Sequence, residues 1–521
     1  MKLKASQLSK ILDKHLLLIV CLLLLVVLRF PNLFEPNWYG DEAIYLTVGQ
    51  AMRYGRELYT SIVDHKTPLI YYLAMMPNQL SFRFLTIMWM ILTTVMFYSI
   101  STNLFNKKTP LVISNLVFVL LTSLPFLEGN IPNGELFVMG FVLAGIIALK
   151  PTRYWRWLTS SRIKLKPDKH SWKLIAAGSL LGLGVLTKVP AVLDFAAVAF
   201  IAWLQLFDGN HQRKLTAKIS QFARTIGLLS LGLIIPILFS ILYFMVQGRG
   251  QDYLQFGLLY NLHYTSNWQL NFNSPLLEFV FSLPGKTVLL GLSLAAISTL
   301  GRKLDRRFKF IFSWLLLTLY AALLSNRPYP HYFQQLVPAF SLLLGYLVKT
   351  VLRPKKITDA VTINLTLLIL LLIVKIALLL NFMPYPTISY YQNFLRYTGG
   401  TINRTEYYQS FNPLMNDTYQ AAAIIKQRNL RQTFIWGTNP MLYDLSDTIP
   451  TGRFTVSFHI KDIGAHESTL TSIKQAQPEM MVVMANESGD FPGFYQYLEE
   501  NYVLAYEFEH MNLYEKNVQT N

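Results

Sequence analysis

The sequence predicts a polytopic α-helical membrane protein of about eleven transmembrane helices, with a small extracytoplasmic α/β domain at its C-terminal end. Of the 521 residues, 52% are hydrophobic and only 14% are charged, whereas about a quarter of the residues of a soluble globular chain are charged. The apolar residues also form long runs, such as residues 15–28 and 365–380. Because about 20 apolar residues cross a bilayer, the composition excludes an ordinary soluble enzyme, and it excludes a disordered chain.

The transmembrane domain is expected over residues 1–381. Its first apolar run is interpreted as a retained anchor and not as a signal peptide, because no small-residue cleavage site precedes Phe30-Pro31. The expected spans are residues 15–31, 84–105, 110–127, 135–149, 174–187, 190–207, 225–247, 284–300, 310–325, 333–348 and 358–381.

The formal net charge of +17 follows from the expected topology. With the N-terminus inside, the inner segments hold 27 of the 46 Lys and Arg residues, and the outer loops before residue 381 hold 8. Such an excess of basic residues on the cytoplasmic side is the positive-inside rule. We therefore expect an integral protein of the plasma (inner) membrane with a cytoplasmic N-terminus, and no nucleic-acid partner.

The polar tail, residues 382–521, is expected to lie on the outer face. Helical patterns alternate there with short runs that are typical of strands. The expected helices are residues 416–428, 468–477 and 493–500, and the expected strands are residues 433–436, 480–484 and 502–508. This alternation predicts a small α/β domain.

The first outer loop, residues 32–83, carries the clearest chemical pattern. Asp41-Glu42 follows the first span, and Asp64-His65-Lys66 precedes an apolar run that begins at Pro68. Both groups of charges are expected near the headgroup boundary, where the phosphate of a lipid would lie.

This loop resembles the first outer loop of the GT-C glycosyltransferases, in particular the branch of protein O-mannosyltransferases (dolichyl-phosphate-mannose-dependent enzymes) and lipid A aminoarabinose transferases. Later segments resemble this branch in the same order along most of the chain. They are Asn133-Gly134-Glu135, the Gly-rich span from Gly182 to Thr187-Lys188-Val-Pro190, Arg327-Pro-Tyr-Pro330-His331-Tyr332, Trp436-Gly437-Thr438-Asn439-Pro440 and Arg453-Phe454.

The resemblance implies an enzyme that moves a monosaccharide, a hexose or a pentose, from a polyprenyl-phosphate carrier to an acceptor hydroxyl outside the membrane. The acceptor would be a protein, a glycolipid or a polysaccharide. Asp41 matches the catalytic acid of the family and is expected to be the general base, with Glu42 as a second candidate, because a hydroxyl needs help to lose its proton. Fixed cations and donors would stabilise the leaving phosphate. The candidate ligands of the carrier phosphate or sugar are Lys66, His65, Glu135, Lys188, Arg327, His331 and Tyr332.

Each candidate residue also has a structural interpretation. Asp41 also suits the N-terminus of a helix, and Glu42 is equally suited to an ion pair with a cation. Lys188 is six residues from Asp194, so the two are as well interpreted as a mutual pair. The other structural interpretations are snorkelling for Lys66 and Arg29, interfacial anchoring for His331 and Tyr332, and helix packing for Gly182-x-Gly184. His263, in an aromatic outer loop, is a further candidate for lining the donor site.

No cofactor is required by this interpretation, although a divalent cation is compatible with it. Asp41 and Glu135 are the possible ligands of such a cation. The alternative function class is a polytopic transporter or lipid flippase. A transporter is expected to hold paired ionisable residues near the bilayer midplane, often within inverted repeats, whereas the acids of this chain cluster at the outer surface.

Overall fold

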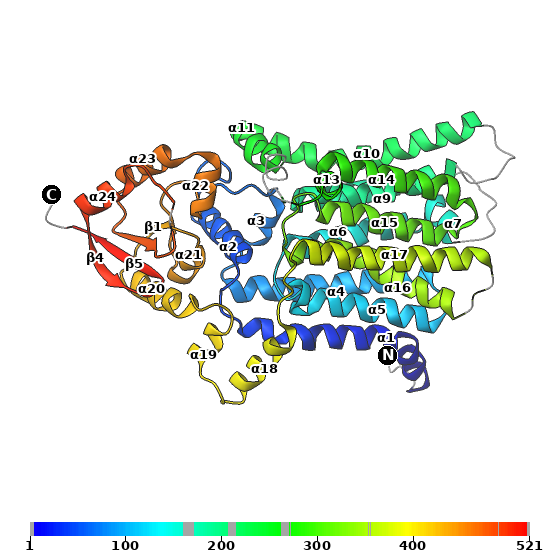
Figure 1. Ribbon diagram of the computed structural model, residues 1–521, viewed down its shortest axis with the longest axis horizontal. Helices are drawn as coiled ribbons and strands as arrows, with labels where there is room; N and C mark the ends of the chain where they lie inside the picture. Colours follow the sequence, from blue (N-terminus) through cyan, green and yellow to red (C-terminus); the bar gives the residue numbers. More distant parts are fainter. Residues whose placement is uncertain are drawn as a thin grey trace. The chain divides into compact units, whose positions relative to one another are not determined.

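The computed structural model describes residues 5–159, 171–206, 215–261, 272–352 and 356–517, with the exception of residue 488 and with the addition of residues 270 and 354. The chain forms two compact units, each built from three segments. The helical unit comprises Met1–Phe30, Thr86–Ser240 and Leu262–Pro386, and the α/β unit comprises Pro31–Leu85, Ile241–Asn261 and Thr387–Asn521. Figure 1 labels their elements.

Long apolar helices make up the helical unit. Each of the eleven expected spans overlaps one helix, and the bounds of these helices agree with the expected ranges within about ten residues at each end. The helices are α1 (Ala5–Arg29), α4 (Gln79–Leu104), α5 (Lys108–Ser123), α6 (Gly134–Leu149), α8 (Trp172–Thr187), α9 (Val192–Leu206), α10 (Leu215–Val246), α14 (Leu283–Thr299), α15 (Arg306–Ala322), α16 (Val337–Val351) and α17 (Ile357–Leu379).

Length and composition identify a smaller number of candidate spans. Within the part of the chain that the structure describes, five segments are long and apolar enough to cross a membrane. A sixth results if α13 (Pro275–Phe281) and α14, which are bent by 74° relative to each other, count as one span. The number of eleven spans therefore stays a prediction. The five segments are His15–Phe34, Gln79–Leu104, Val189–Leu206, Leu215–Val246 and Ile357–Leu379.

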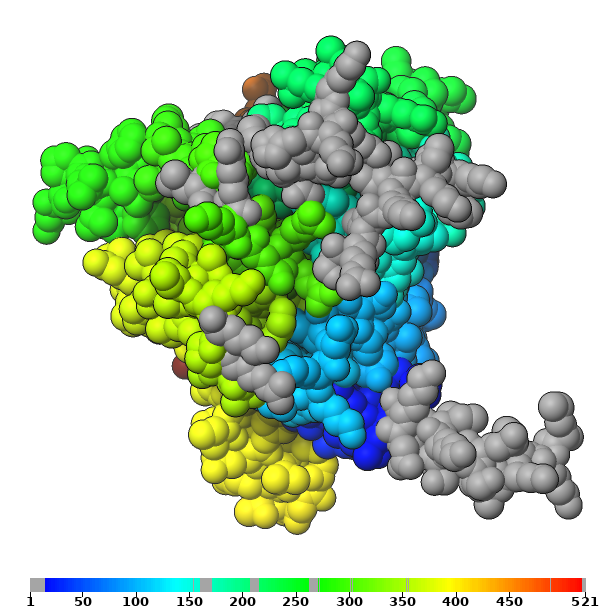
Figure 2. All heavy atoms as spheres, turned by 90° about the vertical axis from the view of Figure 1, so that its right-hand side faces the viewer, coloured from blue at the N-terminus to red at the C-terminus, as the bar shows by residue number. Residues whose placement is uncertain are grey.

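Helices of this unit pack closely, and α5 lies against α16, which also contacts α17. Figure 2 views the unit towards the ends of its helices, where the light-blue and yellow-green segments lie side by side. Small residues allow the closest approach, between α8 and α10. A Cβ atom added at Gly182 would lie 2.6 Å from the carbonyl oxygen of Leu233, which confirms helix packing as the role of this glycine.

Arg29, at the end of α1, is fully buried. Its guanidinium donates hydrogen bonds to the carbonyl oxygens of Thr122, at 2.7 Å, and of Gly129. The snorkelling interpretation is therefore wrong. The carbonyl groups at the end of α5 provide partners inside the protein, so the cation has no need to reach the membrane surface.

A five-stranded sheet with the order β2-β1-β3-β5-β4 forms the centre of the tail. β1 pairs in parallel with β2 and β3, and β5 is antiparallel to β3 and β4. The expected helices and strands of the tail are all present, but β2, β5 and four further helices (α18, α19, α21 and α22) were not expected. The strands are β1 (Gln432–Trp436), β2 (Ile449–Pro450), β3 (Met480–Met484), β4 (Tyr502–Glu507) and β5 (Met511–Lys516).

Helices surround this sheet, and its core includes Ile435, Val482 and Leu513 together with Ala421 and Ile425 of α20. The expected cap of α20 does not form, because Asn416 and Asp417 lie inside its first turn. The tail helices are α18 (Thr387–Thr398), α19 (Arg404–Gln409), α20 (Met415–Gln427), α21 (Met441–Ser446), α22 (Ser457–Ile463), α23 (His466–Ala476) and α24 (Phe494–Asn501).

The first outer loop folds together with the tail. Its helix α2 (Gly40–Arg53) contacts α21, and the side-chain amide of Gln50 donates hydrogen bonds to the carbonyl oxygens of Tyr443 and Thr448, at 3.2 and 2.8 Å. The amide of Val63 donates to the carbonyl oxygen of Arg453 at 2.7 Å. The compact unit is thus larger than a tail domain beginning at residue 382, because the loop provides polar groups that the tail pairs.

The close contact of α8 and α10 leads to a stability prediction. A Cβ atom at Gly232 would lie 2.1 Å from the carbonyl oxygen of Ile175, whereas one at Gly227, on the same helix, would meet nothing within 4 Å. We expect Gly232→Ala to destabilise the protein by about 1–3 kcal/mol, as overpacking does. Gly227→Ala should leave the stability equal or slightly higher. Thermal unfolding of both variants in detergent measures this difference, and equal midpoints would contradict the packing.

Candidate active site

Helix α2 places two carboxylates at the start of the first outer loop. Asp41 and Glu42 lie in its first turn, where the helix dipole favours negative charge. They point to different surroundings, because successive side chains on a helix are turned by about 100°. The side chain of Asp41 is 27% exposed, whereas that of Glu42 is fully buried.

Glu42 forms a buried ion pair with Arg83. The guanidinium binds both carboxylate oxygens, with distances of 2.7 Å from Nε to Oε1 and 2.6 Å from Nη2 to Oε2. Nη1 also donates to the carbonyl oxygen of Asn32 at 2.6 Å. Burial raises the pKa of Glu42, and the charge and hydrogen bonds of Arg83 offset this only in part. This placement matches the structural interpretation of Glu42 as the partner of a cation.

Asp41 instead lies beside Lys66 and Tyr45. The ammonium of Lys66 is 3.4 Å from Oδ1 of Asp41, and the hydroxyl of Tyr45 donates to Oδ2 at 3.2 Å. Lys66 also lies over the Tyr45 ring, with its Nζ 4.9 Å from the ring centroid. The structure therefore brings the expected base and the expected phosphate ligand together. Both side chains retain some exposure, 27% for Asp41 and 10% for Lys66.

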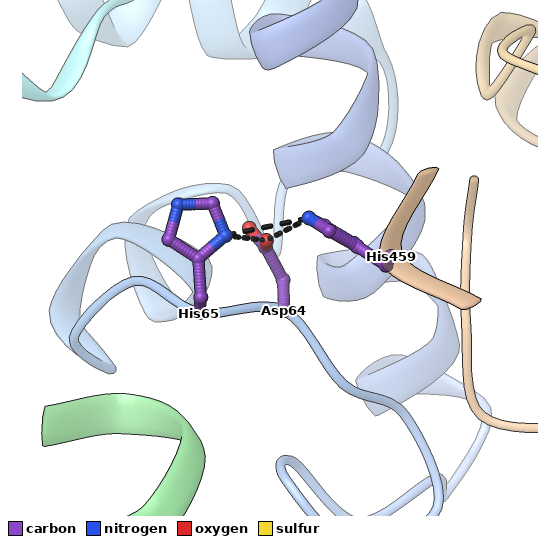
Figure 3. Close-up of side chains that lie close together, drawn as sticks. All are labelled: Asp64, His65 and His459. Atoms are coloured by element: carbon purple, nitrogen blue, oxygen red, sulfur yellow. Dashed lines mark hydrogen bonds and ion pairs between the residues drawn. The ribbon is translucent and has the colours of Figure 1, made fainter. Parts of the chain in front are cut away.

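A second cluster lies next to Lys66 and consists of Asp64, His65 and His459. Oδ1 of Asp64 is 3.0 Å from Nδ1 of His65 and 3.3 Å from Nε2 of His459. The two imidazole nitrogens are 3.3 Å apart, and Figure 3 shows both rings directed at the same carboxylate. The hydroxyl of Tyr71 donates to the other oxygen, Oδ2, at 2.5 Å. Asp64 and His459 are buried, with exposures of 1% and 3%.

The surroundings of Asp64 and His459 determine the charge state of each side chain. Burial alone would raise the pKa of Asp64, but the positive charge of Lys66 and the interaction with His65 outweigh burial and hold this pKa well below its usual range. Burial lowers the pKa of His459 to about 3. At neutral pH, Asp64 is therefore a carboxylate and His459 a neutral imidazole.

The loop that carries these residues is held by a contact within the loop and by contacts from two other segments of the α/β unit. Tyr59, with a positive φ of 71°, donates from its hydroxyl to the carbonyl oxygen of Lys66 at 2.8 Å. The side chain of Asn261 donates to the carbonyl oxygen of His65 at 2.8 Å. Arg453, from the Arg453-Phe454 pair noted in the sequence, donates to the carbonyl oxygen of Tyr59 at 2.8 Å. The positions of His65 and Lys66 thus depend on contacts that are distant in sequence.

Other candidates meet in the helical unit. Lys188, at the end of α8, forms an ion pair with Glu135 in the first turn of α6, and its Nζ lies 4.5 Å from the centroid of the Tyr332 ring. The neighbouring His331 places Nδ1 at 2.7 Å from Oε2 of Glu128. Glu128 was not a candidate from the sequence, because no motif surrounds it.

The remaining candidates have different surroundings. Arg327 is half-buried in the turn that precedes η6 (Pro330–Leu336). Asp194 accepts hydrogen bonds from Nε1 of Trp314 at 2.7 Å and from Nε2 of Gln335 at 2.6 Å. The proposed pair of Asp194 with Lys188 is therefore wrong, since each residue has other partners. His263 lies outside the described residues.

Comparisons with known proteins identify solved structures of similar fold. No protein-family model matches the sequence, and no curated protein matches it. ArnT from Cupriavidus metallidurans bound to undecaprenyl phosphate is similar in structure, with a TM-score of 0.54, 12% identity, and coverage of 96% of this chain and 98% of that chain. The apo state of ArnT gives a TM-score of 0.51 at 12% identity, with coverage of 95% and 97%.

An oligosaccharyltransferase from Archaeoglobus fulgidus, tethered to an acceptor peptide, gives a TM-score of 0.43 at 14% identity, with coverage of 97% of this chain and 74% of that chain. The likeness to ArnT confirms the fold class expected from the sequence, a bundle of apolar helices with a small C-terminal sheet. The five long apolar segments identify the chain as an integral membrane protein.

The different surroundings of Glu42 and Asp41 predict different effects of substitution on stability. Arg83→Met should lower the stability by about 3–5 kcal/mol, because it leaves the buried Glu42 charge without its partner. The double variant Glu42→Gln/Arg83→Met should recover part of this loss. Asp41→Asn should stay close to the wild type, since Asp41 is partly exposed. Thermal unfolding in detergent compares the variants, and an unaffected Arg83→Met would contradict the ion pair.

Asp444, on α21, predicts a pH dependence of stability. Burial, with the nearby charge of Glu42, raises its pKa from 3.8 to about 6. An acid whose pKa is raised in the folded state contributes stability below its unfolded pKa and loses it as the pH rises through its folded pKa. The wild type should thus lose about 2 kcal/mol between pH 4.5 and pH 7.5 through this group, out of about 3 kcal/mol over the whole titration. Asp444→Asn should remove this loss, whereas Asp447→Asn, at an exposed position, should keep it. Unfolding midpoints from pH 4.5 to 7.5 measure the effect, and parallel profiles of the wild type and Asp444→Asn would contradict it.

Proposed function

We propose that this protein transfers a monosaccharide from a polyprenyl-phosphate carrier to an acceptor hydroxyl at the outer face of the membrane. The observation that carries the proposal is the contact between Asp41 and Lys66, a carboxylate and an ammonium 3.4 Å apart, both of which retain exposed surface. The fold supports the choice of donor, because ArnT, which has a similar fold, was solved bound to undecaprenyl phosphate.

In the proposed reaction, Asp41 accepts the proton of the acceptor hydroxyl. The hydroxyl oxygen forms a bond to the anomeric carbon of the donor sugar, and the bond from that carbon to the phosphate oxygen breaks. The polyprenyl phosphate leaves with the electron pair, and the ammonium of Lys66 stabilises the negative charge that develops on it. This single displacement inverts the anomeric centre and needs no nucleophile from the enzyme.

Lys66 suits this role because its partner is exchangeable. A partly exposed ion pair contributes little to stability, about 0–1 kcal/mol, so a phosphate can replace or join Asp41 at small cost. The charge-assisted hydrogen bonds that a phosphate would gain contribute about 1.5–3 kcal/mol each. Tyr45, which donates to Asp41 at 3.2 Å, would hold the carboxylate in place while Lys66 engages the phosphate.

In the helical unit, Lys188 stays a proposed contact of the carrier phosphate or sugar. Glu135 and the ring of Tyr332 position its ammonium. His331, the partner of Glu128, lies on the same element as Tyr332. We also retain Arg327 as a proposed contact of the carrier. The acceptor in this proposal is a protein, a glycolipid or a polysaccharide.

Donor turnover tests the proposal. Purified protein would be incubated with a panel of polyprenyl-phosphate sugars and with membrane extract as the source of acceptors, and released polyprenyl phosphate would be measured by mass spectrometry. We expect release from one donor, lowered at least about 100-fold in Asp41→Asn, as for loss of a general base. Lys66→Met should lose comparable activity, and Lys66→Arg should retain part of it because it keeps the charge.

Asp447→Asn serves as the matched control, because it neutralises an exposed acid of the same unit. Equal turnover in Asp41→Asn and wild type would contradict the role of Asp41 as base. Movement of a labelled lipid across proteoliposomes, without release of polyprenyl phosphate from any donor, would favour the transporter or flippase.

A further inference from the structure

We propose that helix α18 docks on the membrane surface, with the side chains of Ile388 and Leu395 inserted into the bilayer. α18 (Thr387–Thr398) is the first helix of the tail and belongs to the α/β unit, and Figure 1 labels it. The partner in this proposal is the lipid surface itself. The proposal goes beyond the transfer reaction and does not depend on it.

α18 has two apolar faces, one buried in the α/β unit and one exposed. Tyr390 and Phe394 are buried, with exposures of 3% and 8%, whereas Ile388 and Leu395 are 74% and 66% exposed. Leu395 follows Ile388 by about two helical turns, so these two side chains form one stripe, on the side of the helix opposite to Tyr390 and Phe394. This exposed stripe is apolar surface that gains free energy when it leaves water.

The buried face attaches α18 to the end of the first candidate span. That span, His15–Phe34, ends at Phe34, whose ring centroid lies 5.5 Å from that of Phe394. The hydroxyl of Tyr390 donates a hydrogen bond to Oε1 of the next residue, Glu35. Because Phe34, Glu35 and α18 all belong to the α/β unit, these contacts hold the helix at the level where the first span leaves the bilayer.

The residues around α18 have the composition of an interfacial segment. Arg396 is the only charged residue between Lys375 and Arg404, and it lies exposed in the last turn of α18. An arginine beside an apolar stripe can extend its charge to the lipid phosphates, and this stretch contains no acid that would repel them. Tyrosine is enriched at membrane–water interfaces, and the stretch contains four, Tyr385, Tyr390, Tyr391 and Tyr397.

The exposed stripe suits a lipid surface better than a second copy of the chain. A specific protein interface of standard size buries about 800 Å² on each partner, which is far more than two side chains provide. A bilayer requires no matching shape, and an interfacial helix buries its apolar face about 5–10 Å into the headgroup and acyl boundary. A docked α18 would hold the α/β unit, which contains Asp41 and Lys66, at the membrane surface.

Site-directed labelling in a bilayer tests the docking. The full chain, with its single cysteine removed by Cys21→Ala, would carry either Ile388→Cys or Leu395→Cys, each labelled with an NBD fluorophore. Both positions are exposed, so neither replacement removes packing. The protein would be reconstituted in nanodiscs of phosphatidylcholine and phosphatidylglycerol. Nitroxides on the acyl chains quench a fluorophore within the bilayer, and iodide quenches one in water.

We expect the lipid nitroxides to quench both labels and iodide to leave both largely unquenched. A nitroxide near the headgroup end of the acyl chain should quench more strongly than one near the methyl end, since an interfacial helix lies only about 5–10 Å deep. Leu504→Cys is the matched control, because Leu504, on β4, is an apolar residue of the same unit with 51% exposure. Its label should show the opposite pattern.

Two results would overturn the proposal. Iodide quenching at Ile388→Cys and Leu395→Cys equal to that at Leu504→Cys would show that the stripe faces water. Protection of both labels from both quenchers would show that protein, such as a second copy of the chain, covers the stripe. The two positions are measured independently, so if one variant does not fold, the other still decides.

Discussion

The attachment of the first outer loop to the C-terminal tail determines the arrangement of the candidate active site. The loop carries Asp41 on α2, but Asp64, His65 and Lys66 lie in its irregular stretch, residues 54–68. An irregular segment does not pair its own backbone groups. The tail provides the missing partners, through the hydrogen bond from Val63 to Arg453 and the contacts of α2 with α21. Without these contacts, the charged groups of the loop would have no fixed geometry. Loops that carry functional groups on a rigid support are a common feature of active sites.

The two ion pairs of the first outer loop differ in how deeply they are buried, and this difference distinguishes a structural role from the proposed functional role. Glu42 and Arg83 are both fully buried and bind each other through two hydrogen bonds, so the removal of either leaves an uncompensated charge in a medium of low polarity. Asp41 and Lys66 also form an ion pair, but solvent reaches both. A pair of this kind can exchange its partner for a substrate at small cost. The adjacent acids of one helical turn thus have different roles, which follow from their surroundings and not from their chemical type.

The sequence predicted those features that depend on local patterns. The apolar runs located the eleven helices, and the alternation of patterns located three strands and three helices of the tail. The order of Asp41 and Lys66 along the loop predicted their proximity. Contacts between residues that are distant in sequence were not predicted, such as those of Glu42 with Arg83 and of Asp194 with Trp314. The sequence around His459 contains no motif, and its role depends on a loop almost 400 residues away. Strand β5 was missed because its segment mixes polar and apolar residues, although pairing on both sides stabilises it.

The fold alone does not determine the function, because one fold supports many activities. The proposed function therefore depends on the charges of the site. Two carboxylates, Asp41 and Asp64, face the single ammonium of Lys66, which leaves this cluster with an excess of negative charge when the imidazoles are neutral. Such a cluster suits the removal of a proton by Asp41, and the ammonium of Lys66 provides the positive charge that a leaving phosphate would need in the proposed reaction.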